Sequence, residues 1–154
     1  MMSSKSDEWE TPKDLFNTLN NEFSFTLDPA CREYNALCEN YYTIEDDGLE
    51  RDWGGHIVFV NPPYGRSIGK WVEKCYRESL NGVKIVMLIP ARTDTRWFHN
   101  YILDKAEIRF IKGRLKFVNR TLPSWREDGN FKISPAPFPT MLVVYNSDSQ
   151  KMGV

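Results

Sequence analysis

Cysteine and histidine are scarce in this 154-residue sequence. The three cysteines are Cys31, Cys38 and Cys75, and the two histidines are His56 and His99. An odd number of scattered cysteines does not suit a disulfide framework, and the five residues match no zinc-binding spacing. We therefore expect reduced, buried thiols and no metal site.

Long apolar runs are also lacking. None approaches the roughly 20 residues that a transmembrane helix needs. The first residues, MMSSKSDEWE, are polar and acidic where a signal peptide would be basic and then apolar. With 41% hydrophobic and 27% charged residues, the composition is that of an ordinary soluble domain. These features predict a cytoplasmic protein with no membrane partner.

The sequence contains no internal repeats, no low-complexity tracts and no linker rich in Gly, Ser or Pro. A chain of this length can bury one core without help from disulfides or metals. We therefore expect one domain over residues 1–154, with residues 1–8 and 147–154 disordered.

Apolar patterning predicts alternating strands and helices. HIVFV and VKIVMLIPA are near-continuous apolar runs, typical of strands covered on both faces, and residues 67–80 carry apolar side chains at helical spacing. A helix is expected in TPKDLFNTLNNEF, with Thr11 as its cap and Pro12 at its first position, and another in TDTRWFHNYIL, capped by Thr93 or Asp94. Between them we expect a strand in SFTLDPA, then a short helix and a strand near residues 41–43. The C-terminal part should contain the strands EIRFIK and RLKFV, an irregular basic loop, and a last strand TMLVVYN. This order predicts an α/β fold with a mostly parallel sheet and helices on both faces.

Three of the predicted strands end in polar or proline residues. Asp28 ends the strand in SFTLDPA, Asn61 follows HIVFV, and residues 90–92 end VKIVMLIPA. Ligands of such sheets bind at the carboxyl ends of the strands. We therefore expect these residues to share one edge and that edge to hold the functional site.

The segment NPPYG, residues 61–65, follows one of these buried strands. Pro62 restricts Asn61 to extended geometry, so the side-chain carbonyl of Asn61 and the main-chain carbonyl of Pro62 can point the same way. Two converging acceptors suit a planar amino group with two N–H donors, and the Tyr64 ring can stack on a nucleobase. The alternative is a plain strand-to-helix turn with a surface tyrosine. The preceding strand and the following amphipathic helix favour the functional interpretation.

Charge is distributed unevenly along the chain. Residues 1–60 carry 4 Lys or Arg against 13 Asp or Glu, whereas residues 105–132 carry 8 against 3. The basic segment also contains Phe117, Trp125 and Phe131, a mixture that suits phosphate contacts and a stacking or wedge residue. The alternatives are a solvated face and a long loop whose aromatic residues pack inward.

The order of several motifs resembles that of phage-type DNA adenine-N6 methyltransferases that use S-adenosylmethionine. The similar stretches are EWETP, LDPAC, DDGLERDW, VFVNPPYG, LIPARTDTRWF and APFPTMLVVY, which together span residues 8 to about 146. The resemblance implies S-adenosylmethionine as cofactor, double-stranded DNA as partner, base flipping, and methyl transfer to the adenine N6 amino group. It also implies a Rossmann-like methyltransferase fold with an antiparallel last strand. Only 33 residues separate Asp28 from Asn61, so we expect a trimmed sheet of about six strands.

The resemblance also suggests roles for individual residues. The flipped adenine would be held by Asn61, Pro62, Pro63 and Tyr64. The cofactor would be bound by Thr11 and Pro12 near its methionine end, by Asp28, Pro29 and Ala30 in the first loop, by Asp47 at its adenine amino group, and by Asn61, with Glu45 a weaker candidate for its ribose. The expected DNA contacts come from the residues themselves. In the basic segment they are Arg114, Lys116, Arg120, Trp125, Arg126 and Lys132, and beside the predicted edge they are Arg66 and Arg92. Simpler roles stay open for some of these residues: Thr11 can cap a helix, Asp28 can end a strand, and Asp46 and Asp47 can be solvated turn residues.

One departure from the family pattern concerns the first loop, which is usually glycine-rich. No glycine lies between Asp28 and Gly48, so the cofactor contacts within residues 30–40, among them Asn35, are left open. Other substrates also stay open. A similar motif serves methyltransferases that modify glutamine side chains on proteins, and recognition of the RNA 2′-OH leaves no mark in the sequence. A third alternative is a DNA-binding module that keeps the fold and has lost the cofactor.

Overall fold

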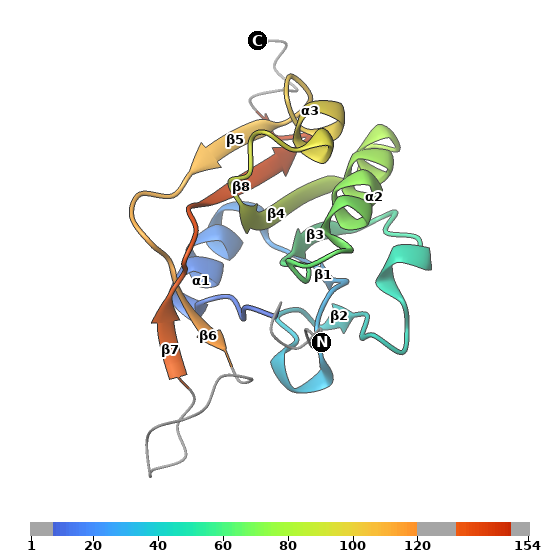
Figure 1. Cartoon of the computed structure of the whole chain (residues 1–154). Coiled ribbons are helices and arrows are strands. Elements are labelled where there is room, and N and C mark those ends of the chain that lie inside the picture. Colours follow the sequence, from blue (N-terminus) through green and yellow to red (C-terminus); the bar gives the residue numbers. More distant parts are fainter. Residues whose placement is uncertain (1–7, 120–131, 149–154) are drawn as a thin grey trace.

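The structure is a computed structural model that describes residues 8–119 and 132–148. Its centre is a six-stranded sheet in the order β2-β1-β3-β4-β8-β5 (Figure 1). The strands are β1 (Leu27–Asp28), β2 (Asn40–Tyr41), β3 (Ile57–Val60), β4 (Lys84–Pro90), β5 (Glu107–Phe110) and β8 (Thr140–Tyr145). Neighbouring strands from β2 to β4 are parallel, and β8 is antiparallel to both β4 and β5. The predicted α/β fold, with about six strands and an antiparallel last strand, is confirmed.

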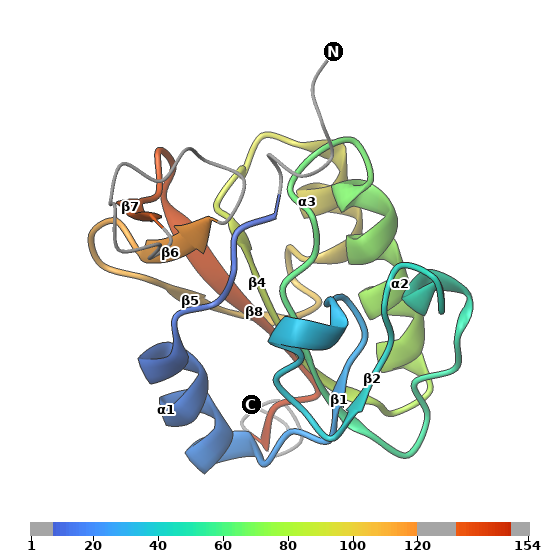
Figure 2. The same cartoon turned by 90° about the horizontal axis from the view of Figure 1, so that it is seen from below.

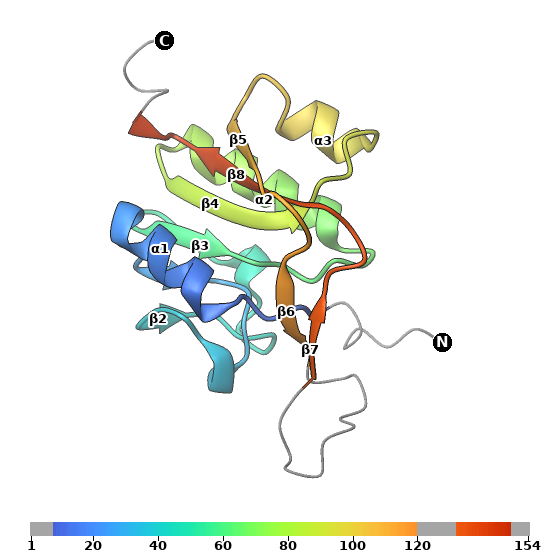
Figure 3. The ribbon, with the colours of Figure 1, turned by 90° about the vertical axis from the view of Figure 1, so that its left-hand side faces the viewer.

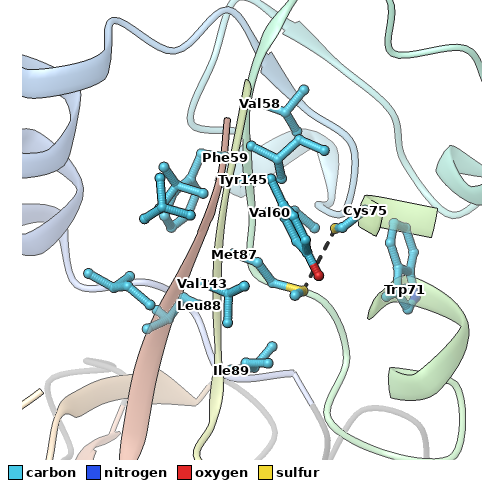
Figure 4. Close-up of a cluster of buried hydrophobic side chains, with 14 of the residues drawn as sticks. Val58, Phe59, Val60, Trp71, Cys75, Met87, Leu88, Ile89, Val143 and Tyr145 are labelled. Atoms are coloured by element: carbon cyan, nitrogen blue, oxygen red, sulfur yellow. Dashed lines mark hydrogen bonds between the residues drawn. The ribbon is translucent and has the colours of Figure 1, made fainter. Parts of the chain in front are cut away.

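Helices cover both faces of this sheet, as expected (Figure 2). On one face α1 (Lys13–Phe23) packs on β3, with the Phe16 and Phe59 rings 5.3 Å apart. On the other face lie α2 (Ile68–Leu80) and α3 (Arg96–Tyr101). Figure 4 shows Cys75 of α2 against Met87 of β4, and the two sulfur atoms are 3.7 Å apart.

Side chains alternate between the two faces because successive residues of a strand point in opposite directions. In β3, Phe59 points toward the α1 side while Val58 and Val60 point toward α2 (Figure 4). All three are fully buried, as are most residues of β4 and β8. The apolar runs therefore mark strands that are covered on both faces.

Some predicted element boundaries are wrong in detail. The residue at the N-cap of α1 is Pro12, and neither it nor Thr11 makes a side-chain cap. The cap of α3 is Thr95, whose hydroxyl accepts the Phe98 N–H at 3.2 Å, instead of Thr93 or Asp94. The strand expected near residues 41–43 is β2, one residue earlier, and the short helix before it is the 3-10 turn η2 (Glu33–Asn35).

The sequence predicts β6 (Lys116–Asn119) but not β7 (Lys132–Pro135). These two strands form a separate two-stranded ribbon, so the irregular loop expected after β6 contains a strand (Figure 3). Glu10 pairs with Val118 on the other side of β6, with backbone hydrogen bonds of 3.0 and 3.4 Å. The ribbon and the N-terminal segment are thus joined edge to edge.

The ends of the described chain are anchored. Glu8 forms an ion pair with Arg32, Ser147 is buried, and Asp148 lies 3.0 Å from the Lys84 ammonium. Other residues expected to be disordered lie outside the described ranges.

The three cysteines are free, with Cys75 buried and the other two half-buried. None of the helices within residues 8–119 and 132–148 is long and apolar enough to cross a membrane.

Candidate active site

A cavity of about 370 Å³ opens at the carboxyl ends of β1 and β3. This is the edge at which parallel sheets bind ligands. The predicted residues that line it are Thr11, Asp28, Pro29, Ala30, Asn35, Asp47, Asn61, Pro62 and Pro63. Pro12, Glu45 and Tyr64 are not among the lining residues. The structure therefore brings the NPPY motif and most of the predicted cofactor residues to one hollow.

The side chain of Asn61 is held at both ends. Its Nδ2 group donates to the Trp9 carbonyl at 2.5 Å and to the Thr11 hydroxyl at 2.9 Å. Its Oδ1 atom accepts the hydroxyl of Tyr64 at 2.5 Å. Both N–H donors are thus satisfied, whereas a carbonyl oxygen has two lone pairs and one is left for another donor.

Tyr64 is a buried residue and not a surface tyrosine. Only 5% of it is exposed, and its hydroxyl lies 2.5 Å from Asn61 Oδ1 and 2.9 Å from the Leu88 carbonyl oxygen. Burial raises the pKa of Tyr64 well above its usual value, so the hydroxyl keeps its proton. A phenol has one hydrogen for these two acceptors, and that hydrogen can turn to Leu88 when another donor reaches Asn61.

Four aromatic residues join the motif to the ribbon. The Tyr64 ring lies edge-on to Phe117 of β6 at 6.2 Å and to Phe138 at 5.7 Å. Trp9 contacts the same two rings at 5.8 and 5.7 Å. In this conformation the Tyr64 ring is covered, so stacking of a base on it requires these neighbours to move.

Asp28 organises the first loop from its centre. The carboxylate is only 3% exposed, and its two oxygens accept the backbone N–H groups of Ala30 at 3.3 Å and Leu37 at 3.1 Å. Asp28 thus does more than end a strand. The loop folds around this carboxylate, which explains how it forms without a glycine.

Burial raises the pKa of Asp28 to about 6, and the N–H groups of Leu37 and Ala30 oppose that shift. Above pH 6 the carboxylate is ionised and accepts both N–H groups, whereas below pH 6 a protonated carboxyl releases one of them. If the loop holds a ligand, the affinity for that ligand should fall about tenfold between pH 7.5 and pH 5. Calorimetry at several pH values measures this, and Asp28→Asn should show no such step. An unchanged affinity across this range in the wild type would contradict the role of the carboxylate.

Gly48 supplies the close backbone approach expected of a glycine-rich loop. A Cβ atom at this position would lie 2.1 Å from the Pro29 carbonyl oxygen, so only glycine fits. The Gly48 carbonyl accepts the indole N–H of the buried Trp53 at 3.0 Å. Trp53 in turn stacks on Trp71, which lines the cavity. The glycine required here comes from the opposite loop, beside Asp47.

The two turn acids behave differently. Asp46 accepts both the backbone N–H and the hydroxyl of Thr43, at 2.9 and 3.0 Å, so it closes its own turn. Asp47 is exposed, has a left-handed backbone with φ 57°, and lines the cavity. Only Asp47 is therefore placed to contact a ligand.

Among the described residues, none of the predicted DNA contacts lines the cavity. Arg66, Arg92, Arg114 and Lys116 are exposed, and the Arg92 guanidinium lies 6.0 Å from the centre of the Phe138 ring. Lys132 lies in β7. Arg120, Trp125 and Arg126 lie outside the described residues.

Several residues of the cavity were not predicted. Trp9, Lys13, Arg32, Leu37, Ile44, Gly48 and Trp71 also line it. For Gly48 a signal existed, because it is the first glycine in the chain. Trp71 belongs to the apolar pattern predicted for residues 67–80, and Trp9 lies in the EWETP motif, where it was given no role. Within residues 8–119 and 132–148 no three His, Cys, Asp or Glu side chains are grouped to hold a metal ion.

Comparison with known proteins decides the family. A family model described as DNA N-6-adenine-methyltransferase (Dam) matches residues 1–149. The chain belongs to the Dam family. A DNA N-6-adenine-methyltransferase of Escherichia phage T1 is 35% identical over 111 residues, 71% of this chain and 46% of the phage protein. The protein of the same name from Haemophilus phage HP1 is 28% identical over 145 residues, 92% of this chain and 80% of that protein.

A third relative is the putative methyltransferase YfdM of Escherichia coli K12, 40% identical over 65 residues, 38% of this chain and 71% of that protein. The chain thus spans about half the length of the phage T1 member of the Dam family and most of the HP1 member. The family predicted from the order of the motifs is confirmed.

Proposed function

We propose that this protein transfers a methyl group from S-adenosylmethionine to the N6 amino group of adenine in double-stranded DNA, in the cytoplasm. The observation that carries the proposal is the side chain of Asn61. Its amide is held so that Oδ1 has a lone pair to spare at the edge of the cavity, next to Pro62. The family membership and the names of the phage relatives support the same reaction.

The cavity suits the cofactor in size and in chemistry. Its volume of about 370 Å³ is within the usual range of small-molecule sites, and its wall combines apolar side chains with a few polar groups. Trp9, Leu37 and Ile44 offer apolar surface, and Asp28 and Asp47 offer carboxylates. Carboxylates suit a ligand that carries a positively charged sulfonium and an ammonium group.

The residues of the motif would act mainly by positioning. S-adenosylmethionine, when bound, supplies an activated methyl group, so the protein has to align the amino nitrogen with it. Asn61 Oδ1 and the Pro62 carbonyl would accept the two amino hydrogens and return electron density to the nitrogen lone pair. Asn61 is a hydrogen-bond acceptor and not a strong base, so the proton would leave after methyl transfer.

An adenine inside a duplex cannot reach this edge, so the base would have to flip out at a cost of about a few kcal/mol. The buried position of Tyr64 adds a step: the base would displace part of the cover formed by Phe117 and Phe138 before it stacks on the ring. Stacking contributes about 1–3 kcal/mol in comparable single-strand sites.

Calorimetry with S-adenosylmethionine tests the cofactor half of the proposal. We expect one molecule to bind per chain, and we expect Asp47→Ala to weaken that binding because Asp47 lines the cavity. Asp46→Ala is the matched control, since its carboxylate is engaged by Thr43. A titration without heat at millimolar cofactor would favour a DNA-binding module that lacks the cofactor.

A second prediction concerns the DNA. Replacing Arg114 and Lys116 by alanine should weaken DNA binding similarly for all sequences, because both are exposed, Lys116 in β6 of the ribbon and Arg114 just before it. The slope of log affinity against log salt should become shallower by about 2, close to 0.9 for each phosphate that the variant no longer neutralises. Filter binding across a salt series measures it. The control is Arg77→Ala, in the last turn of α2. An unchanged slope in the double variant would show that the ribbon does not contact DNA.

A further inference from the structure

We propose that Thr11 is a positioning residue that holds the carboxamide of Asn61 in place for methyl transfer, in the orientation that the Trp9 carbonyl selects. The inference rests on the proposed function, since it assigns a role next to the catalytic Asn61. It differs from both roles that the sequence suggests for Thr11, which are a helix cap and a cofactor contact. The structure excludes the cap, because α1 has no side-chain cap.

The orientation of Asn61 matters because its side chain has two unlike ends. One end is a carbonyl oxygen that accepts hydrogen bonds, and the other is an NH₂ group that only donates. A half-turn of the amide would exchange them and place a donor against the amino group of the target base. Two donors repel each other, so only one orientation of Asn61 can hold the substrate.

Three contacts hold the amide, and only the first selects its orientation, because the hydroxyls of the other two can donate as well as accept. The Trp9 carbonyl can only accept, and it lies 2.5 Å from Asn61 Nδ2, so an oxygen in that position would be repelled. The Tyr64 hydroxyl reaches Oδ1, but the same hydrogen can also turn to Leu88. Thr11 provides the third contact, from its hydroxyl oxygen to Nδ2 at 2.9 Å. When a base takes Oδ1 and Tyr64 turns away, Trp9 and Thr11 alone keep the amide in place.

Thr11 can do this because the segment that precedes it is held at two points. Before it, the Glu8 carboxylate forms a bidentate ion pair with Arg32, which donates from Nε at 2.8 Å and from Nη2 at 2.9 Å. Next to it, Glu10 pairs with Val118 through two backbone hydrogen bonds. Within this segment, the Trp9 carbonyl and the Thr11 hydroxyl both reach Asn61 Nδ2. Among the described residues, no other hydrogen bond of the Thr11 hydroxyl is found, so its contact with Asn61 is the one that the fold provides.

The test compares Thr11→Val, which keeps the shape and loses the hydroxyl, with Thr11→Ser, which keeps the hydroxyl. We expect kcat for adenine methylation, at saturating cofactor and DNA, to fall about five- to tenfold in Thr11→Val, the factor of about one neutral hydrogen bond. Thr11→Ser should restore most of it. Thr18→Val is the matched control because it removes an exposed hydroxyl from α1, the helix that follows Thr11, where the hydroxyl donates to the Asp14 carbonyl.

The same experiment separates the competing roles. If Thr11 contacts the cofactor instead, the defect of Thr11→Val disappears at saturating cofactor and calorimetry shows weaker cofactor binding, and this would overturn the proposal. A kcat equal to that of the wild type overturns it as well. Should Thr11→Val fold poorly, Thr11→Ala is measured in the same way. Failure of the proposed function itself would give a different result, because the wild-type protein would then methylate no adenine at all.

Discussion

Asn61→Ala is expected to lower the rate of methyl transfer to adenine by about 100-fold or more, the loss typical of removing one group that acts in the transition state. The alanine cannot accept the amino hydrogen that Oδ1 would accept. Cofactor affinity should change much less, because the Asp28 loop and Asp47 form most of the remaining wall. Single-turnover transfer and calorimetry on the same preparation measure the two effects separately.

Part of any loss in this variant is structural, since Asn61 also holds Trp9 and Thr11. Asn146→Ala is a suitable control: Asn146 likewise donates from Nδ2 to two acceptors, the Ser79 and Val83 carbonyls, but it follows β8 at the opposite end of the sheet. We expect it to lose stability and keep methyl transfer. If Asn61→Ala instead loses cofactor binding and keeps the rate at saturation, Asn61 has been given the wrong role.

Gly48→Ala is expected to lower both stability and cofactor affinity. The new Cβ atom would lie 2.1 Å from the Pro29 carbonyl oxygen, a contact with backbone that no rotation of a side chain can relieve. The two loops that carry Pro29 and Asp47 must therefore move apart. Overpacking of this kind costs about 1–3 kcal/mol, and displacement of the wall should weaken the cofactor about tenfold or more. Thermal unfolding and calorimetry measure these losses.

The control for this variant is Gly69→Ala in α2. The nearest atom to a Cβ there is in the Trp97 side chain at 3.5 Å, an ordinary contact, and alanine favours a helix by up to about 1 kcal/mol. Gly69→Ala should therefore be neutral or stabilising. A Gly48→Ala protein that binds the cofactor as tightly as the wild type would show that the approach of the two loops does not shape the site.

The main sheet could be predicted from the sequence because its strands carry a strong signal. HIVFV and VKIVMLIPA are near-continuous apolar runs, and the structure buries most of their residues between the two faces. Strand β7 carries no such signal, since Lys132–Pro135 contains one large apolar residue, Ile133, and that residue is exposed. This strand depends on its pairing with β6, and that pairing cannot be predicted from the local sequence.

The site was predictable where a residue's role depends on its place at the end of a strand. Asp28 and Asn61 lie together at the expected edge, because parallel strands end on the same side. The contacts between Asn61 and Thr11 were not predictable, since the two residues are 50 positions apart. Nor was the burial of Tyr64, which depends on aromatic rings from β6 and from the segment before β8.

The most direct test is to incubate unmethylated double-stranded DNA with the protein and tritium-labelled S-adenosylmethionine, and then to separate the nucleosides. We predict that the label appears in N6-methyldeoxyadenosine and that Asn61→Ala removes it. RNA and protein substrates measured in parallel should stay unlabelled. Label in a cytosine derivative, in RNA or in glutamine, or no label in DNA with the wild-type protein, would contradict the proposed function.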